Sequence, residues 1–221
     1  SQTWPAWFTS EPQELTGVGI ASYSQYNPQQ GFNKAFQKAI EDLNANAMIS
    51  VYSESFSFSG YSTQFFDEFA IPSLFDSTSV ARADSSAVGN WAFAMVKPKS
   101  HSGGNTVKPM PQFNVSGWTS PDFFPVNQSG YWIASGMHEK SEFAPYQSWS
   151  QAKQDALSRL SHYIQTGIEN TTSMYNRYSS ETTYTYSKCL IHNVRVVRRK
   201  TDSDSLYVLI AVHQDNIETF N

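Results

Sequence analysis

Charged side chains are scarce in this chain. Asp, Glu, Lys and Arg make up 15% of its 221 residues and leave a net charge of −4, whereas an average soluble domain is about 25% charged. A nucleic-acid-binding domain usually carries a basic excess, so the acidic balance argues against that class of partner. The surface must be polar through uncharged side chains, and 32 serines supply much of that polarity.

Cysteine and long apolar runs are also lacking. Cys189 is the single cysteine, so no disulfide can form within the chain, and no apolar run approaches the roughly 20 residues that cross a bilayer. The sequence starts at Ser1 and not at Met, which is typical of a mature terminus whose targeting segment has been removed. A charge-poor surface rich in Ser, Thr, Asn and Gln favours a compartment outside the cytoplasm.

An internal duplication is the strongest pattern in the sequence. A shift of 117 positions places Gly19 on Gly136, Ala35 on Ala152 and Ala39 on Ala156. Downstream the shift is 116, and residues 91–96 then match residues 207–212. Repeated supersecondary units produce this kind of self-similarity. We therefore predict two tandem repeats, residues 4–97 and 118–214, joined by a linker over 98–117.

Each repeat is predicted to contain one amphipathic helix, because apolar residues recur at i, i+3, i+4 and i+7 in both halves. The apolar sets are Phe32, Ala35, Phe36, Ala39, Ile40, Leu43 and Ala47 in the first helix, and Trp149, Ala152, Ala156, Leu157, Leu160, Ile164 and Ile168 in the second. The polar faces are expected to carry Lys34, Lys38, Glu41 and Asp42 in the first, and Lys153, Asp155 and Arg159 in the second.

Strands are predicted on both sides of each helix. Short strands precede the helices over 15–23 and 131–137, and Ser/Thr/Tyr-rich extended segments follow them over 50–59 and 171–186. Hairpins then pair 78–83 with 91–96 and 191–198 with 206–212. The predicted fold class is α+β, with two tandem repeats in which a long amphipathic helix packs on a small antiparallel sheet in a β-α-β-β-like order. We expect the two repeats to form a pseudo-twofold pair.

Several motifs with a chemical interpretation are better explained structurally. Gly17-Val18-Gly19 lacks the third glycine of a dinucleotide-binding loop, and His138-Glu139 lacks the second histidine of a zinc-protease helix. Cys189 and His192 are three residues apart on a strand and face opposite sides, so Cys189 is expected to be a buried apolar residue.

The remaining charged motifs have no evident catalytic partner. The carboxylate pairs Glu41-Asp42 and Asp67-Glu68 would need a shared cleft to act as acid and base, and the basic residues within 195–200 are typical of a charged hairpin tip. The sequence therefore assigns no catalytic, cofactor-binding or metal-binding residue.

An aromatic segment over 65–75 corresponds to a polar segment in the second half. It either caps the sheet and fills the seam between the repeats, or forms an exposed apolar patch for a partner protein. The candidate contact residues are Phe65, Phe66, Phe69, Ile71, Leu74 and Phe75.

Short motifs in both halves resemble the Lpp-twenty type of bacterial lipoprotein. They are Leu-Thr-Gly-Val-Gly-Ile-Ala at 15–21, Ala-Phe-Gln-Lys-Ala-Ile-Glu-Asp-Leu at 35–43, Ile-Ser-Val-Tyr-Ser at 49–53, Trp-Ser-Gln-Ala-Lys-Gln-Asp-Ala-Leu at 149–157 and Tyr-Val-Leu-Ile-Ala-Val at 207–212. The N-terminal part of the flagellar assembly protein T family is also similar.

The resemblance implies a signal peptide and a lipid-modified cysteine before Ser1, and a place on either side of the bacterial outer membrane. It implies a non-enzymatic envelope lipoprotein with a structural or protein-binding role in an envelope or appendage assembly. The expected partner is another envelope protein, with a homo-oligomer as a further option, and no cofactor is implied. The alternative is a small-ligand binder with its pocket between helix and sheet or between the repeats, and a hydrolase is a third class.

Overall fold

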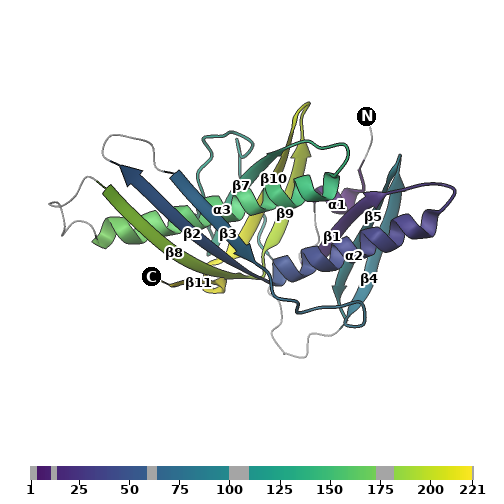
Figure 1. Ribbon diagram of the computed structural model, residues 1–221, viewed down its shortest axis with the longest axis horizontal. Coiled ribbons are helices and arrows are strands. Elements are labelled where there is room, and N and C mark those ends of the chain that lie inside the picture. The colour runs from purple at the N-terminus through teal and green to yellow at the C-terminus, as the bar shows by residue number, and fades with distance from the viewer. Residues whose placement is uncertain (1–3, 11–13, 59–63, 100–109, 173–181, 221) are drawn as a thin grey trace.

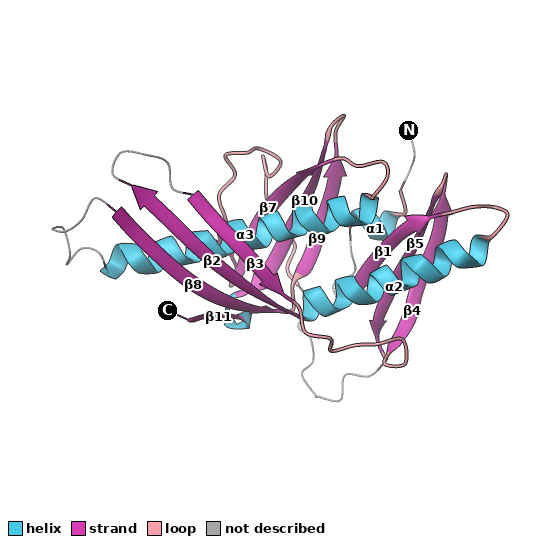
Figure 2. Ribbon diagram, viewed as in Figure 1, coloured by secondary structure: helices cyan, strands magenta, loops and turns pink. Residues whose placement is uncertain are grey.

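The computed structural model describes residues 4–10, 14–58, 64–99, 110–172 and 182–220. These residues form three α-helices and three antiparallel sheets (Figure 1, Figure 2), which confirms the predicted α+β class. The helices are α1 (Ala6–Thr9), α2 (Pro28–Ala47) and α3 (Pro145–Thr172), with a short 3-10 helix, η2 (Gln214–Asn216). The strands are β1 (Gly17–Ser22), β2 (Met48–Phe58), β3 (Gln64–Ala70), β4 (Val80–Val88), β5 (Trp91–Pro98), β6 (Val126–Gln128), β7 (Tyr131–Glu139), β8 (Thr182–His192), β9 (Arg195–Thr201), β10 (Ser205–His213) and β11 (Ile217–Phe220).

One of the three sheets combines strands from both halves of the chain. The strand orders are β1-β5-β4, β6-β7-β10-β9 and β11-β8-β2-β3. In Figure 1 the first sheet lies at one end of the long axis, and β8, β2 and β3 lie at the other. β2 pairs antiparallel with β8, from Met48 opposite His192 to Phe58 opposite Thr182. Backbone hydrogen bonds therefore join the two halves directly.

Helix α2 contacts the sheet of β1, β5 and β4 through small residues. The helix begins at Pro28, where a proline is tolerated because the first N–H groups have no partner within the helix. Ala35, Ala39 and Leu43 are fully buried in one apolar cluster with residues of β1 and β5. A Cβ atom at Gly19 would lie 2.0 Å from the carbonyl oxygen of Ala35. This close approach supports the structural interpretation of the glycines in β1.

Helix α3 packs in the largest apolar cluster, which includes residues of all three sheets. Ala156, Leu157 and Leu160 are fully buried in it, together with Val208 of β10 and Ile49 of β2. A Cβ atom at Gly136 of β7 would lie 2.0 Å from the carbonyl oxygen of Ala152. The same helix therefore covers β7 and β10 and also contacts the sheet that the two halves share.

Helix α1 closes an aromatic cluster between the two halves. Trp4 and Phe8 pack against Phe93 of β5 and Trp149 of α3, with ring centroids 5.2 to 5.7 Å apart. Arg199 of β9 donates a hydrogen bond of 2.9 Å to the carbonyl oxygen of Phe8, and its guanidinium lies 4.4 Å from the Phe8 ring centroid. Arg199 thus holds the N-terminal segment against β9. The sequence interpretation, in which the basic residues within 195–200 form a charged hairpin tip, does not apply to Arg199.

Two predicted strand boundaries in the second half are wrong. Helix α3 extends to Thr172 and β8 begins only at Thr182, while residues 173–181 of the predicted extended segment lie outside the described residues. Ile191, the expected start of the last hairpin, belongs to β8 and pairs with Ile49. The chain turns at Asn193, whose φ of 51° is a left-handed conformation that asparagine adopts more readily than most residues. No glycine or proline marks that turn in the sequence.

The second part of the predicted linker packs on a sheet. Phe113 is buried against Ile133 of β7 and Leu209 of β10, and Trp118 joins the same cluster. Residues 110–117 therefore contribute apolar side chains to the folded body, while residues 100–109 lie outside the described part of the chain.

Candidate functional site

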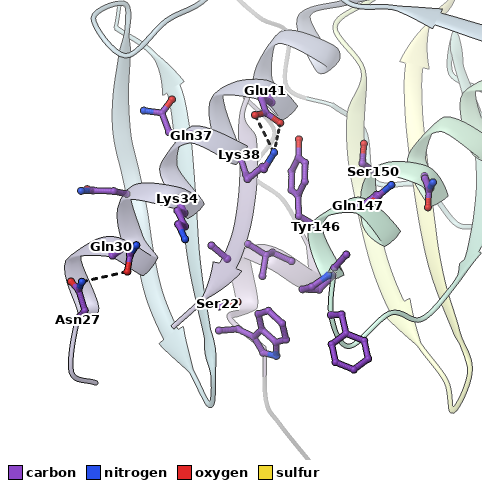
Figure 3. Close-up of a pocket in the computed structure, with 18 of the residues that line it drawn as sticks. Ser22, Asn27, Gln30, Lys34, Gln37, Lys38, Glu41, Tyr146, Gln147 and Ser150 are labelled. Carbon is purple, nitrogen blue, oxygen red and sulfur yellow. Dashed lines mark hydrogen bonds and ion pairs between the residues drawn. The ribbon is translucent and has the colours of Figure 1, made fainter. Parts of the chain in front are cut away.

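A groove of about 1150 Å³ lies between the N-terminal parts of α2 and α3 (Figure 3). Lys38 of α2 points toward Tyr146 of α3, and Gln37 and Gln147 also line the groove from these two helices, which form its walls. Ile20 of β1 and Trp91 of β5 also line it. Because α2 and α3 belong to different halves of the chain, the groove lies between the two predicted repeats.

Uncharged polar side chains dominate this groove. Eight carboxamides line it, namely Asn27, Gln29, Gln30, Asn33, Gln37, Gln147, Gln151 and Gln154. Two pairs satisfy one another within α2 and its N-cap, Asn27 with Gln30 and Gln29 with Asn33. Among the described residues, Gln37 and Gln147 have no side-chain hydrogen-bond partner. They are exposed, so their amides can bind an incoming molecule.

An ion pair and a tyrosine lie next to each other in the lining of the groove. Lys38 forms an ion pair of 3.0 Å with Glu41, and its ammonium lies 5.1 Å from the ring centroid of Tyr146. Burial raises the pKa of the Tyr146 phenol, and the negative charges of Asp42 and Glu41 raise it further. The Tyr146 hydroxyl therefore stays protonated and can both donate and accept a hydrogen bond.

A buried ion pair joins α2 to α3 beside the groove. Lys153 Nζ lies 2.5 Å from Asp42 Oδ1 and donates to Asn46 Oδ1 at 2.7 Å. The second carboxylate oxygen of Asp42 accepts a hydrogen bond of 2.9 Å from the backbone N–H of Val18. Tyr146 lines both the groove and the small cavity around this ion pair. The buried pair and its partners therefore fix the relative position of the groove walls.

The predicted exposure of Asp42 and Lys153 is wrong. Both were expected on polar helix faces, yet Asp42 is 6% exposed and Lys153 is 3% exposed. The sequence does indicate that Asp42 is buried, because Asp42 follows Ala35 by seven residues and Ala39 by three. That spacing places it on the apolar face of the helix. A charged residue at such a position indicates a buried partner, since an unpaired charge would be strongly destabilising there.

The second carboxylate pair also contains a residue with hydrogen-bond partners on neighbouring elements. Asp67 of β3 accepts hydrogen bonds from Ser53 of β2 and from Ser158 and His162 of α3. The bond from Ser53 is 2.6 Å long and the one from His162 is 2.8 Å long. The sequence interpretation, in which Asp67 had no evident partner, is therefore wrong. Asp67 connects the edge strand of the shared sheet to α3.

The Asp67 cluster contains serine, histidine and aspartate but lacks the arrangement of a hydrolase triad. A serine nucleophile is hydrogen-bonded to the histidine that deprotonates it, and the aspartate orients that histidine. Here Ser53 and Ser158 both donate to the Asp67 carboxylate. The cluster therefore has the geometry of a carboxylate held by three donors, which is a structural role.

The Asp67 cluster predicts an acid-dependent loss of stability. Burial raises the pKa of Asp67, but the hydrogen bonds from His162, Ser158 and Ser53 outweigh it and hold the pKa below 3.8. A carboxyl whose pKa is lower in the folded state stabilises the fold above its unfolded pKa, and this contribution is lost as the pH falls through the folded value. We expect Asp67→Asn to lose about 1 to 2 kcal/mol at neutral pH.

Urea unfolding of both proteins at a series of pH values measures this effect. The difference between wild type and Asp67→Asn should narrow progressively below about pH 4. A difference that stays constant down to about pH 2.5 would show that the Asp67 charge does not contribute.

The predicted partner-contact residues are partly exposed and partly packed. Phe66, Ile71 and Leu74 are 62%, 43% and 48% exposed. Phe69 packs against the largest cluster and Phe75 against the cluster under α2. Phe65 lies in β3 opposite Ser55, and its side chain is outside the described part of the structure. The segment therefore contributes side chains to two apolar clusters and leaves three apolar side chains accessible, and its role as a partner contact stays a prediction.

Other sequence motifs have no role in the groove. Cys189 is 1% exposed, which confirms the expected buried residue, and burial raises the pKa of its thiol. His138 and Glu139 lie at the end of β7, where His138 Nδ1 contacts the carbonyl oxygen of Glu139. Within the described ranges, no group of three potential metal ligands comes together.

Comparison with known proteins gives no relative for this chain: no protein-family model, no curated protein and no solved structure matches it. None of the described helices is long and apolar enough to cross a membrane. The groove, its carboxamides and the adjacent ion pair are therefore the observations from which a function can be argued.

Proposed function

We propose that this protein is a non-catalytic binding protein that holds its ligand in the groove between α2 and α3. The observation that carries the proposal is that both helices line the groove with carboxamides that have no side-chain hydrogen-bond partner among the described residues, Gln37 on α2 and Gln147 on α3. A concave site with converging polar groups is the usual form of a ligand pocket. Of the three function classes that the sequence leaves open, this geometry favours the ligand binder.

A duplicated origin of the two walls is part of this proposal. Gly19 contacts the backbone of Ala35 and Ala39, and Gly136 contacts that of Ala152 and Ala156, at the same offset of 117 residues. The antiparallel pairing of β2 with β8 is also the arrangement expected at a pseudo-twofold axis between two copies. We infer that the tandem units are related in this way and that each contributes one helix to the groove.

The envelope location and the lipid anchor stay part of the proposal and rest on the resemblance to the Lpp-twenty lipoproteins. They can be tested on the full precursor expressed in a bacterial host. Metabolic labelling with a fatty acid should label the protein, and substituting the acceptor cysteine upstream of Ser1 should abolish the label. An unlabelled precursor found in the cytoplasm would contradict the proposed location and lipid anchor, while the proposal that the groove binds a ligand would stand.

A protein-binding role is the second candidate function. It is favoured by the exposure of Phe66, Ile71 and Leu74, three large apolar side chains within nine residues. Single exposed apolar residues are common on protein surfaces. Phe66, Ile71 and Leu74 belong to the segment 65–75, which the sequence offers as a candidate contact for a partner protein. In a structural envelope role, the partner would bind these three residues and not the groove.

Occupation of the groove can be tested by ligand-observed NMR with a mixed fragment library that includes sugars, short peptides, inorganic anions and aromatic compounds. The variants Gln37→Trp and Gln147→Trp place bulk on opposite walls at exposed positions. Gln214→Trp is the matched control, because Gln214 is also exposed and does not line the groove. We expect hits that both groove variants lose and the control retains. If no compound class binds, or if all three variants bind alike, the groove is not the site.

A further inference from the structure

We propose that the groove binds a neutral oligosaccharide chain. This inference rests on the proposed function, because it names the ligand class of that same groove. Three observations support an oligosaccharide ligand: the hydrogen-bonding chemistry of the lining side chains, their aromatic surfaces, and the volume of the hollow.

The carboxamides match the chemistry of a polyhydroxylated ligand. A carboxamide presents a donor group and an acceptor oxygen side by side, and a sugar hydroxyl also donates and accepts. The eight carboxamides of the groove are joined by Ser22, by Ser150 and by the protonated Tyr146 hydroxyl, which have the same dual capacity. A ligand with many hydroxyls can therefore pair with this lining without leaving a donor facing a donor.

The charges of the groove do not favour an ionic ligand. Lys34, Lys38 and Glu41 are its ionisable lining residues besides Tyr146, and Lys38 is paired with Glu41 at 3.0 Å. Lys34 alone remains as an unbalanced cation among the described lining residues. Sites that bind carboxylates or phosphates use several charge-assisted donors, typically arginines. No arginine is among the described lining residues, and Lys34 is the one lining cation there without an acidic partner, so the groove favours a neutral ligand over an anionic one.

Aromatic side chains supply the apolar contact that a sugar ring needs. Trp91, Phe143 and Tyr146 line the groove, with Phe143 97% exposed and Trp91 half-buried. The faces of aromatic rings carry negative partial charge and attract weakly polarised C–H groups. Sugars carry such C–H groups on the faces of their rings. Trp91 is held at the start of β5, where it pairs with Ser22, so this contact is fixed by a sheet and not by a loop.

The hollow continues beyond Trp91 and has the volume to hold a chain of sugars. A second hollow of about 1130 Å³ shares Ile20, Trp91, Phe143 and Pro145 with the groove and extends to the turn between β9 and β10. Pockets for single small molecules measure about 300 to 1,000 Å³, and each of the two hollows exceeds this range. Trp91 and Phe143 line both hollows, so a bound chain would pass over these two rings with sugars on both sides.

Titration of the folded protein with cellohexaose, maltohexaose and chitohexaose tests this inference. We expect at least one of them to bind with a Kd of about 1 mM or tighter, measured by calorimetry and by backbone amide shifts of residues in α2 and α3. Trp91→Ala should weaken binding about tenfold or more. Gln147→Ala changes an exposed side chain without affecting the core, and it should weaken binding without changing the unfolding midpoint. Gln214→Ala is the matched control and should bind as wild type does.

Inorganic phosphate and an unstructured neutral peptide are titrated in parallel as competing classes. If either shifts the groove residues while no oligosaccharide does, the ligand class proposed here is wrong and the proposed function stands. If none of the probes and no fragment binds, both proposals fall. If an oligosaccharide binds but Trp91→Ala and Gln147→Ala retain wild-type affinity, the sugar site lies outside the groove and this inference is overturned.

Discussion

Substituting alanine for Gly19 should lower the free energy of unfolding by about 3 kcal/mol, the upper end of the usual cost of overpacking, and Gly136→Ala should have a similar effect. The added Cβ would lie 2.0 Å from a helix carbonyl oxygen at both positions, that of Ala35 in the first case and that of Ala152 in the second. These are backbone atoms, so neither clash can be relieved by rotating a side chain. The helix would have to move away from its sheet, which would open the apolar contacts of that half.

Urea unfolding monitored by circular dichroism and tryptophan fluorescence measures both variants, with Ser22→Ala as the control. Ser22 is an exposed residue of β1, and its replacement should change stability by no more than about 0.5 kcal/mol. Similar losses at Gly19 and Gly136 would support the equivalence of the two halves. Tolerance of alanine at either position, with a loss below about 1 kcal/mol, would contradict the close helix–strand contact there.

The sequence predicted the two long helices and the two hairpins, β4 with β5 and β9 with β10, because their patterns are local. The apolar spacing of α2 and the glycines of β1 depend on contacts between segments that follow one another in the chain. The hairpin of β4 and β5 is likewise marked by its turn, Gly89-Asn90, where Gly89 has a φ of 57°. For these elements the apolar spacing and the turn residues were sufficient to predict the structure.

The shared sheet and the buried polar contacts could not be predicted in this way. β2 and β8 are separated by more than a hundred residues, and their alternating Ser, Thr and Tyr residues would suit pairing with many other strands. Lys153 likewise gives no local sign of its partner 111 residues away. The position of the groove depends on both contacts. Its lining could be read from the sequence as polar residues, but not as one site.

Removing the carboxylate of Asp42 should destabilise the protein by about 3 to 5 kcal/mol, because Asp42→Ala leaves the Lys153 ammonium buried without its counter-ion. The exposed pair of Lys38 and Glu41 provides a matched control on the same helix. Glu41→Ala should change stability by no more than about 1 kcal/mol, since exposed ion pairs contribute little. Chemical unfolding at neutral pH measures both. A loss for Asp42→Ala no larger than that for Glu41→Ala would mean that Lys153 reaches water and that the pair does not join the helices.

The double variant Asp42→Leu with Lys153→Met separates the cost of an unpaired charge from the loss of the contact itself. Replacing both members of a buried ion pair by apolar residues is often nearly neutral, so this protein should regain part of the stability that Asp42→Ala loses. The recovery should stop about 1 to 3 kcal/mol short of wild type, because the backbone N–H of Val18 loses its acceptor and Asn46 Oδ1 loses its donor.

Since the same network positions the groove walls, the double variant should bind the groove ligand more weakly than its recovered stability alone suggests. Full recovery of stability with unchanged binding would show that apolar packing, and not the polar network, sets the separation of α2 and α3.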